Sequence, residues 1–167
     1  MSFEIDISSR QDIFSIDVRA LTQAIETALQ IERVANAVLS VSVVDNNAIH
    51  QINHEHLQHD YPTDVISFQL DFASDGGTLD NPPAELRAAD AWIEGEIIAS
   101  AEMAADMALS GEWTAMNELT LYVIHGLLHI CGYDDLTPDE KAIMRTRERA
   151  ILNALALNPV YADDEAA

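Results

Sequence analysis

The chain has 167 residues, of which 49% are hydrophobic, and it contains a single cysteine, Cys131. A chain of this length buries a substantial core without disulfides, so we expect one domain over residues 1–157 in a reducing compartment. No apolar run approaches the roughly 20 residues that a membrane-spanning helix needs, and the first residues lack the pattern of a secretory signal. These features predict a cytoplasmic protein with no membrane partner.

The charge balance excludes a generally basic nucleic-acid-binding protein. The chain has 29 acidic and 8 basic residues, and its formal net charge is −21. Such a field repels phosphate. Four of the eight basic residues nevertheless fall close together, at Lys141, Arg145, Arg147 and Arg149. One local basic surface is therefore compatible with an acidic chain whose remaining charge serves solubility.

The first half of the chain predicts two strands and two helices. Residues 3–8 alternate apolar and polar side chains, which is typical of a strand with one buried face. Residues 18–34 carry apolar side chains at helical spacing and predict an amphipathic helix. Residues 37–45 are rich in β-branched side chains and predict a second strand, which ends at a pair of asparagines. A short helix is expected over residues 47–57.

The middle of the chain predicts two further strands, at residues 64–70 and 92–98. Residues 71–91 between them contain paired glycines and paired prolines and have no periodic apolar face, so we expect a variable surface loop. Residues 99–109 are rich in alanine and predict a helix. The acidic tail, residues 158–167, is expected to be disordered.

Two helices are predicted near the end of the folded region. Residues 114–131 are apolar around most of a helical circumference, which indicates a helix buried in the core. The last helix begins at Thr137, where Thr-Pro-Asp-Glu combines an N-cap, a proline at the first helical position and a glutamate three residues after the cap. Together the elements predict an α/β fold of the α+β type, a single compact domain with a small mixed sheet of about four strands packed with helices.

The buried helix and its exit carry the residues of a predicted metal site. His125 and His129 lie four residues apart, so both imidazoles leave the same face, roughly 5.4 Å apart along the axis. Gly132 follows, and glycine allows the chain to leave a helix through a left-handed conformation. The turn returns Asp135 toward the histidines as a third ligand. An isolated pair of histidines would more often be core residues, but the full pattern H-x-x-x-H-x-x-G-x-x-D favours metal.

Three protein ligands and an open fourth position are typical of catalytic zinc, so the sequence predicts one zinc ion per chain with a bound water as nucleophile. Cys131 is interpreted as a small buried hydrophobe because three ligands are already present. A peptidase of this spacing would carry a glutamate directly after the first histidine. That position is Gly126, which disfavours a peptidase.

The block HGLLHICGYDD, with the upstream segments INHEHLQHDYPTDVISFQL and IEGEII, resembles the YbeY family of bacterial rRNA maturation endoribonucleases. The resemblance implies a compact α/β fold, zinc, and hydrolysis of single-stranded ribosomal RNA at the three-prime end of the small-subunit RNA. It also implies association with the ribosome or small-subunit proteins and a part in ribosome quality control. Asp135 replaces the family's usual histidine ligand, and Leu57 aligns with an arginine thought to bind phosphate.

Three basic residues are candidate phosphate contacts. Lys141, Arg145 and Arg149 are spaced by four on the last helix and form one stripe beside the metal-bearing turn. The alternative is a solvated helix face that pairs internally with Glu140 and Glu148. The sequence leaves these two interpretations open.

Further polar residues are weaker candidates. His56 and His59 are candidates for lining the cleft and assisting proton transfer, although the histidines of this segment otherwise suit a polar helix surface. Glu96 is a candidate for orienting a histidine ligand or accepting a proton, with a solvent-facing strand position as the alternative. Thr63, Asp64 and Ser67 are interpreted as structural.

Two other functions compete with the endoribonuclease. One is a metallopeptidase or another zinc hydrolase. The other is a metal-bearing, ribosome-associated binding module with little catalysis, which the leucine at position 57 favours.

Overall fold

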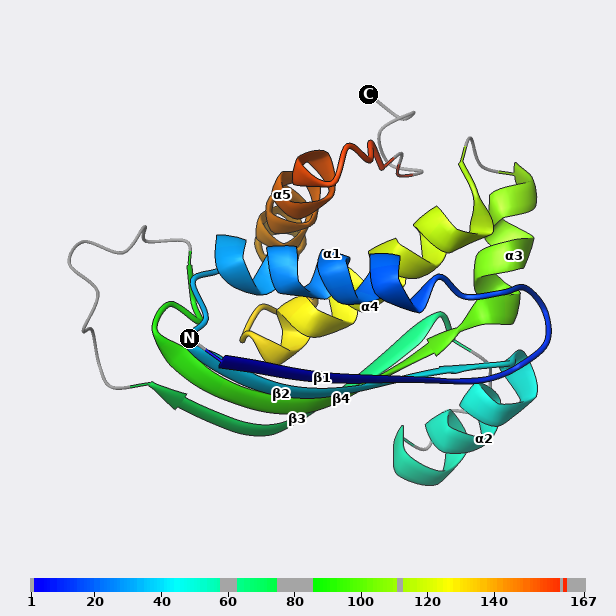
Figure 1. The fold of residues 1–167 in the computed structure, drawn as a ribbon, viewed down its shortest axis with the longest axis horizontal. Helices are drawn as coiled ribbons and strands as arrows, with labels where there is room; N and C mark the ends of the chain where they lie inside the picture. Colours follow the sequence, from blue (N-terminus) through cyan, green and yellow to red (C-terminus); the bar gives the residue numbers. More distant parts are fainter. Residues whose placement is uncertain (1, 58–62, 75–85, 111–112, 160, 162–167) are drawn as a thin grey trace.

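The computed structural model describes residues 2–57, 63–74, 86–110, 113–159 and 161. Within this part of the chain the element order is β1 (Ser2–Arg10), α1 (Val18–Ile31), β2 (Asn36–Val44), α2 (Asn46–Leu57), β3 (Val65–Ser74), β4 (Ala91–Ser100), α3 (Ala101–Ser110), α4 (Ala115–Ile130) and α5 (Pro138–Ala154). The chain forms one small α+β domain, as the sequence predicts (Figure 1).

Two predicted boundaries differ from the observed ones by more than two residues. The helix predicted over residues 18–34 ends at Ile31, because Arg33 adopts a left-handed φ of 58° that a helix does not accommodate. The loop predicted over residues 71–91 is partly strand, since β3 continues to Ser74 and pairs with the start of β4. Residues 75–85 of that loop lie outside the described residues.

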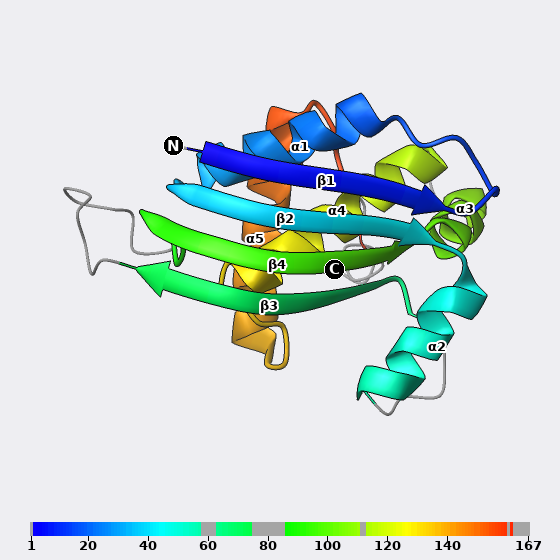
Figure 2. The same ribbon diagram turned by 60° about the horizontal axis from the view of Figure 1, so that its bottom comes forward.

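The sheet is mixed, with strand order β1-β2-β4-β3. The pairs β1–β2 and β2–β4 are parallel, and β3 pairs antiparallel with β4 at the edge. Helices α1, α4 and α5 lie over one face of the sheet, and α2 lies against the other face at one end (Figures 1 and 2). Figure 2 shows that, among the described residues, most of this second face carries no helix.

Helix α4 lies at the centre of the core, between the sheet and helices α1 and α5. Two glycines permit its close approach to the sheet. A Cβ at Gly95 on β4 would lie 2.6 Å from Ile130 Cδ1, and a Cβ at Gly126 would lie 3.1 Å from Ile97 Cγ2. The glycine after the first histidine therefore serves packing of α4 on the sheet.

A buried polar network joins α1, α5 and the turn after α4. Glu32 is completely buried and accepts hydrogen bonds from Arg147 Nε at 3.0 Å and from the Tyr133 hydroxyl at 2.7 Å. Since a charge this deep in the protein is tolerated only when it is paired, the network fixes the turn against the core. Among the described residues, none of the helices combines the length and apolar character that a bilayer crossing requires.

Candidate metal centre

The turn after α4 reverses the chain, as the sequence predicts. Gly132 has a φ of +99°, and its amide donates to the His129 carbonyl at 3.0 Å. The Tyr133 amide donates to the Leu128 carbonyl at 3.1 Å. These bonds satisfy carbonyls at the end of the helix and direct the following residues back along it. Asp135 is thereby placed beside the histidines of α4.

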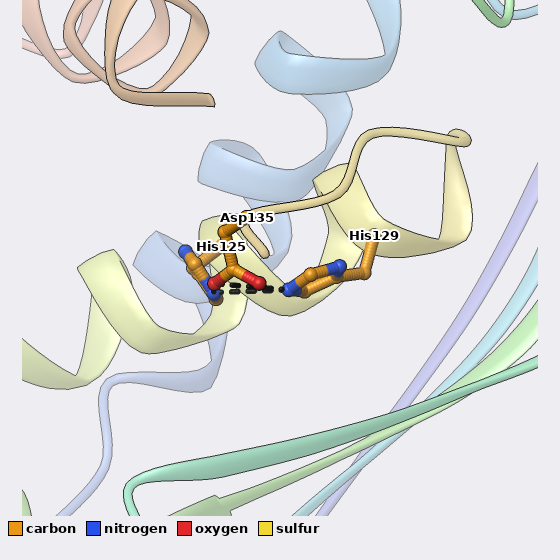
Figure 3. A group of neighbouring side chains, drawn as sticks. All are labelled: His125, His129 and Asp135. Atoms are coloured by element: carbon orange, nitrogen blue, oxygen red, sulfur yellow. Dashed lines mark hydrogen bonds and ion pairs between the residues drawn. The ribbon is translucent and has the colours of Figure 1, made fainter. Parts of the chain in front are cut away.

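His125, His129 and Asp135 converge on one point (Figure 3). The Nε2 atoms of the two histidines are 3.1 Å apart, and Asp135 Oδ2 lies 3.2 Å from His125 Nε2 and 3.5 Å from His129 Nε2. Ligand atoms at about 2.0–2.1 Å from a tetrahedral zinc ion are separated by about 3.3 Å. The three donor atoms therefore already have the mutual spacing of a zinc site.

The second ring nitrogen of each histidine faces an acceptor. His129 Nδ1 donates to the Tyr133 carbonyl at 2.9 Å, and His125 Nδ1 lies 3.5 Å from Glu148 Oε2. A carbonyl oxygen can only accept, so the proton of neutral His129 resides on Nδ1 and its Nε2 lone pair points to the cluster. The histidine side chains are each 25% exposed and Asp135 is 35% exposed, which leaves one side of the cluster open to solvent.

Electrostatics at the cluster favour positive charge. Burial lowers the pKa of His125, but the adjacent Glu148 carboxylate, followed by the charge of Asp135, outweighs burial and raises it above its ordinary value. A cation is therefore stabilised at this point. Cys131 is fully buried, and burial raises the pKa of its thiol, which confirms its interpretation as a small hydrophobe.

The cluster forms one wall of a cavity of about 450 Å³. Leu57, at the position where the family resemblance places an arginine, lines this cavity together with His125, His129 and Asp135. Thr63, Asp64 and Ser67, for which the sequence favours a structural role, also line the cavity. All three belong to TDVISFQL, part of a segment that carries the family resemblance. That resemblance is the sequence feature that could have indicated their place at the cavity.

The three residues of the predicted basic stripe do not all line the same cavity. Lys141 and Arg145 line a second cavity of about 260 Å³, which shares His125 and Asp135 with the first. Arg149 does not line it. The Arg145 guanidinium lies 4.1 Å and that of Arg149 lies 4.8 Å from the centre of the Tyr161 ring. Tyr161 belongs to the tail expected to be disordered, of which residues 160 and 162–167 lie outside the described residues.

Two further candidates do not lie at the cluster. His56 on α2 contacts the edge of Phe68, whose side chain packs with Ile66 on the sheet face opposite α4. Glu96 is exposed on that same face, because its neighbours Gly95 and Ile97 are the residues that pack on α4. The hypothesis that Glu96 orients a histidine ligand is therefore wrong. His59 lies outside the described residues.

Comparison with known proteins gives one consistent family. Residues 6–156 match the family described as Endoribonuclease YbeY. An Endoribonuclease YbeY of Rhodopirellula baltica is 38% identical over 147 residues, which cover 87% of this chain and 68% of that protein. One of Carboxydothermus hydrogenoformans is 34% identical over 155 residues, 91% of this chain and 97% of that protein. One of Bacillus subtilis is 34% identical over 159 residues, 94% of this chain and 98% of that protein.

A solved structure supports the fold. A Thermotoga maritima protein, known from its solution structure, matches 91% of each chain with a TM-score of 0.55 and 19% sequence identity. At this identity the likeness concerns the arrangement of strands and helices alone.

Proposed function

The chain belongs to the Endoribonuclease YbeY family, and from this premise we propose that it is a metal-dependent endoribonuclease specific for single-stranded RNA. Membership confirms the predicted enzyme class, a hydrolase acting on RNA. The finer proposal is that the chain processes ribosomal RNA at the three-prime end of the small-subunit RNA. Ribosome quality control, binding to the ribosome or its small-subunit proteins, and a cytoplasmic location belong to the same proposal.

The observation that carries this proposal is the convergence of three donor atoms at distances of 3.1, 3.2 and 3.5 Å. In the proposed site His125 and His129 hold one zinc ion through Nε2, and Asp135 holds it through a carboxylate oxygen. When bound, a zinc ion would act as a Lewis acid toward the substrate phosphate and would lower the pKa of a water molecule. The donor set also accepts nickel, iron or manganese, so zinc is the choice that metal analysis must test.

Residues of this chain supply substrate binding in the proposal. Lys141 and Arg145 line the cavity that His125 and Asp135 also line, so both cations border the same space as the cluster. In the proposal these cations bind the phosphates that flank the cleaved bond, and they partly offset the four carboxylates of the same cavity, Asp64, Glu118, Asp135 and Glu148. In the proposal, residues 1–157 act as one metallohydrolase domain.

Salt dependence tests the phosphate contacts. Replacing Arg145 by alanine is expected to weaken binding to single-stranded RNA and to reduce the slope of log affinity against log salt by about 1. Arg19→Ala is the matched control, because Arg19 is exposed on α1 and does not line either cavity at the cluster. If Arg145→Ala and Arg19→Ala gave the same slope of log affinity against log salt, Arg145 would not contact a phosphate.

Two alternatives remain distinguishable. A metallopeptidase needs a base at the position of Gly126. A side chain there would press against Ile97 and Val65, so the packing of α4 on the sheet favours glycine. A ribosome-associated binding module would hold metal and RNA without turnover. Leu57 is the feature that favours this second alternative, because it removes an expected cation from the cavity wall.

The direct test compares substrates with purified protein. Single-stranded RNA is expected to be cleaved internally, while the same sequence in a duplex and an unstructured peptide remain intact. Cleavage is expected to be lost with a chelator and in His125→Ala. Cleavage that persists in His125→Ala refutes the metal mechanism, peptide cleavage favours the peptidase, and RNA binding without cleavage favours the binding module.

A further inference from the structure

Glu148, in the second half of α5, carries a buried carboxylate that has no role in the proposed function. The residue is 3% exposed. Its Oε1 accepts a hydrogen bond from the Tyr161 hydroxyl at 3.3 Å. Within the described residues Oε2 has no hydrogen-bond partner, and it lies 3.5 Å from Nδ1 of His125.

A buried carboxylate in this position needs an explanation. Taking an ionised group out of water costs several kcal/mol unless a charge or a donor compensates for the lost solvation. The donor that Oε2 faces is the imidazole of His125, whose opposite nitrogen lies 3.2 Å from Asp135 Oδ2. Glu148 therefore faces Nδ1 of His125, whose other ring nitrogen, Nε2, belongs to the cluster with His129 and Asp135.

The two histidines of the cluster share this arrangement. His129 has the Tyr133 carbonyl behind Nδ1, and His125 has the Glu148 carboxylate behind Nδ1. Both Nε2 atoms then point at the same position, 3.1 Å from each other. Acceptors behind metal-bound imidazoles fix the tautomer and the ring orientation and increase ligand basicity.

We propose that Glu148 is a positioning residue that keeps the proton of His125 on Nδ1 and so aims the Nε2 lone pair at the metal. The inference deepens the proposed function and rests on its metal site. It assigns Glu148 no contact with substrate. Its contribution is expected mainly in metal affinity, because it acts through the orientation and basicity of His125.

Three variants test the assignment. Glu148→Ala removes the acceptor, and Glu148→Gln retains an acceptor oxygen without the charge. Glu26→Gln is the matched control, because it makes the same change of charge at an exposed position on α1. Circular dichroism and thermal unfolding establish that each variant is folded. Should the alanine variant fail to fold, the glutamine variant supports the same measurements.

The first measurement is zinc affinity, obtained by competition with a chelator at fixed pH. Glu148→Ala is expected to bind about 10- to 100-fold more weakly than the unaltered protein. Glu148→Gln is expected to lie between the two, and Glu26→Gln is expected to be unchanged. Equal zinc affinity in both folded Glu148 variants and the control would overturn the proposal.

The second measurement is the ¹⁵N spectrum of the His125 imidazole in metal-free protein, above the pKa of that ring. The unaltered protein is expected to show the proton on Nδ1, and Glu148→Ala to shift the population toward Nε2–H. An unchanged tautomer in a folded Glu148→Ala variant would also overturn the assignment. Neither measurement uses RNA, so absence of RNA cleavage would defeat the proposed function and leave the role of Glu148 independently tested.

Discussion

The carbonyl oxygen of Tyr133 lies 2.9 Å from Nδ1 of His129, so a residue outside α4 fixes the orientation of a ring proposed to bind metal. Tyr133 is itself held, because its hydroxyl donates to the buried Glu32 at 2.7 Å. The turn at Gly132 brings this carbonyl into place. The metal cluster thus depends on a backbone conformation that glycine permits.

Gly132→Ala is expected to destabilise the fold and to weaken metal binding. At a φ of +99° an alanine is strained by about 1–2 kcal/mol. Steric overlap contributes little, because the nearest atom to an added Cβ is Arg87 Cβ at 3.8 Å. Urea unfolding of the metal-free protein measures the first effect and chelator competition the second. Unaltered values for both would contradict the role assigned to the turn.

Gly95→Ala is expected to cost more stability than Gly126→Ala. A Cβ at Gly95 would lie 2.6 Å from Ile130 Cδ1 and 2.9 Å from the Phe68 carbonyl, so α4 or the sheet must move, at about 1–3 kcal/mol. At Gly126 the nearest atoms are side-chain methyl groups at 3.1 and 3.2 Å, and the helix propensity of alanine offsets about 1 kcal/mol. Denaturant unfolding of both variants gives the order, and the reverse order would contradict the packing described here.

The buried pair of Glu32 and Arg147 gives a third prediction. Arg147→Met is expected to destabilise the protein by about 3–5 kcal/mol, because it leaves the Glu32 carboxylate buried without its cation. Adding Glu32→Gln to this variant is expected to recover part of the loss, since no uncompensated charge then remains. Thermal and denaturant unfolding measure both. A double variant no more stable than Arg147→Met would show that buried charge is not the cause.

Much of the site follows from local sequence. The four-residue spacing of His125 and His129 places both rings on one face of any helix, and Gly132 marks where that helix ends. The return of Asp135 depends on only a few residues of turn. These relationships are short in sequence, so they were predictable without knowledge of the tertiary structure.

Residues brought in by packing were not predictable in the same way. Glu148 reaches His125 only because α5 packs against α4, and the sequence placed Glu148 only in one of two open interpretations, as a partner of neighbouring cations on α5. The sequence left the face of Glu96 open, because β4 has apolar residues on both faces, Ile97 toward α4 and Ile98 toward α2. Alternation alone cannot decide which face receives a helix.

In the fold, too, local features could be predicted from the sequence and long-range ones could not. The strands and helices were predicted with boundaries that shifted by a few residues, because periodicity and capping are local properties. The strand order β1-β2-β4-β3, with β4 inserted between strands that precede it, depends on contacts far apart in the sequence. Neither hydrophobic pattern nor turn chemistry determines that order.

Leu57→Arg is expected to strengthen binding of single-stranded RNA. Leu57 is 43% exposed and lines the cavity that contains His125 and His129, so an arginine there adds a cation beside the metal cluster. The slope of log affinity against log salt is expected to steepen by about 1. Leu70→Arg is the matched control, because Leu70 is 57% exposed and lines a cavity on the opposite sheet face. An equal gain in both variants would assign the effect to net charge alone.

The central claim is that one metal ion held by His125, His129 and Asp135 is required for RNA cleavage. The most direct measurement is a titration of metal-free protein with zinc, in which bound metal and cleavage of single-stranded RNA are followed together. Cleavage is expected to be absent at the start, to rise in proportion to bound zinc and to level off at one ion per chain. Full cleavage by the metal-free protein would contradict the claim.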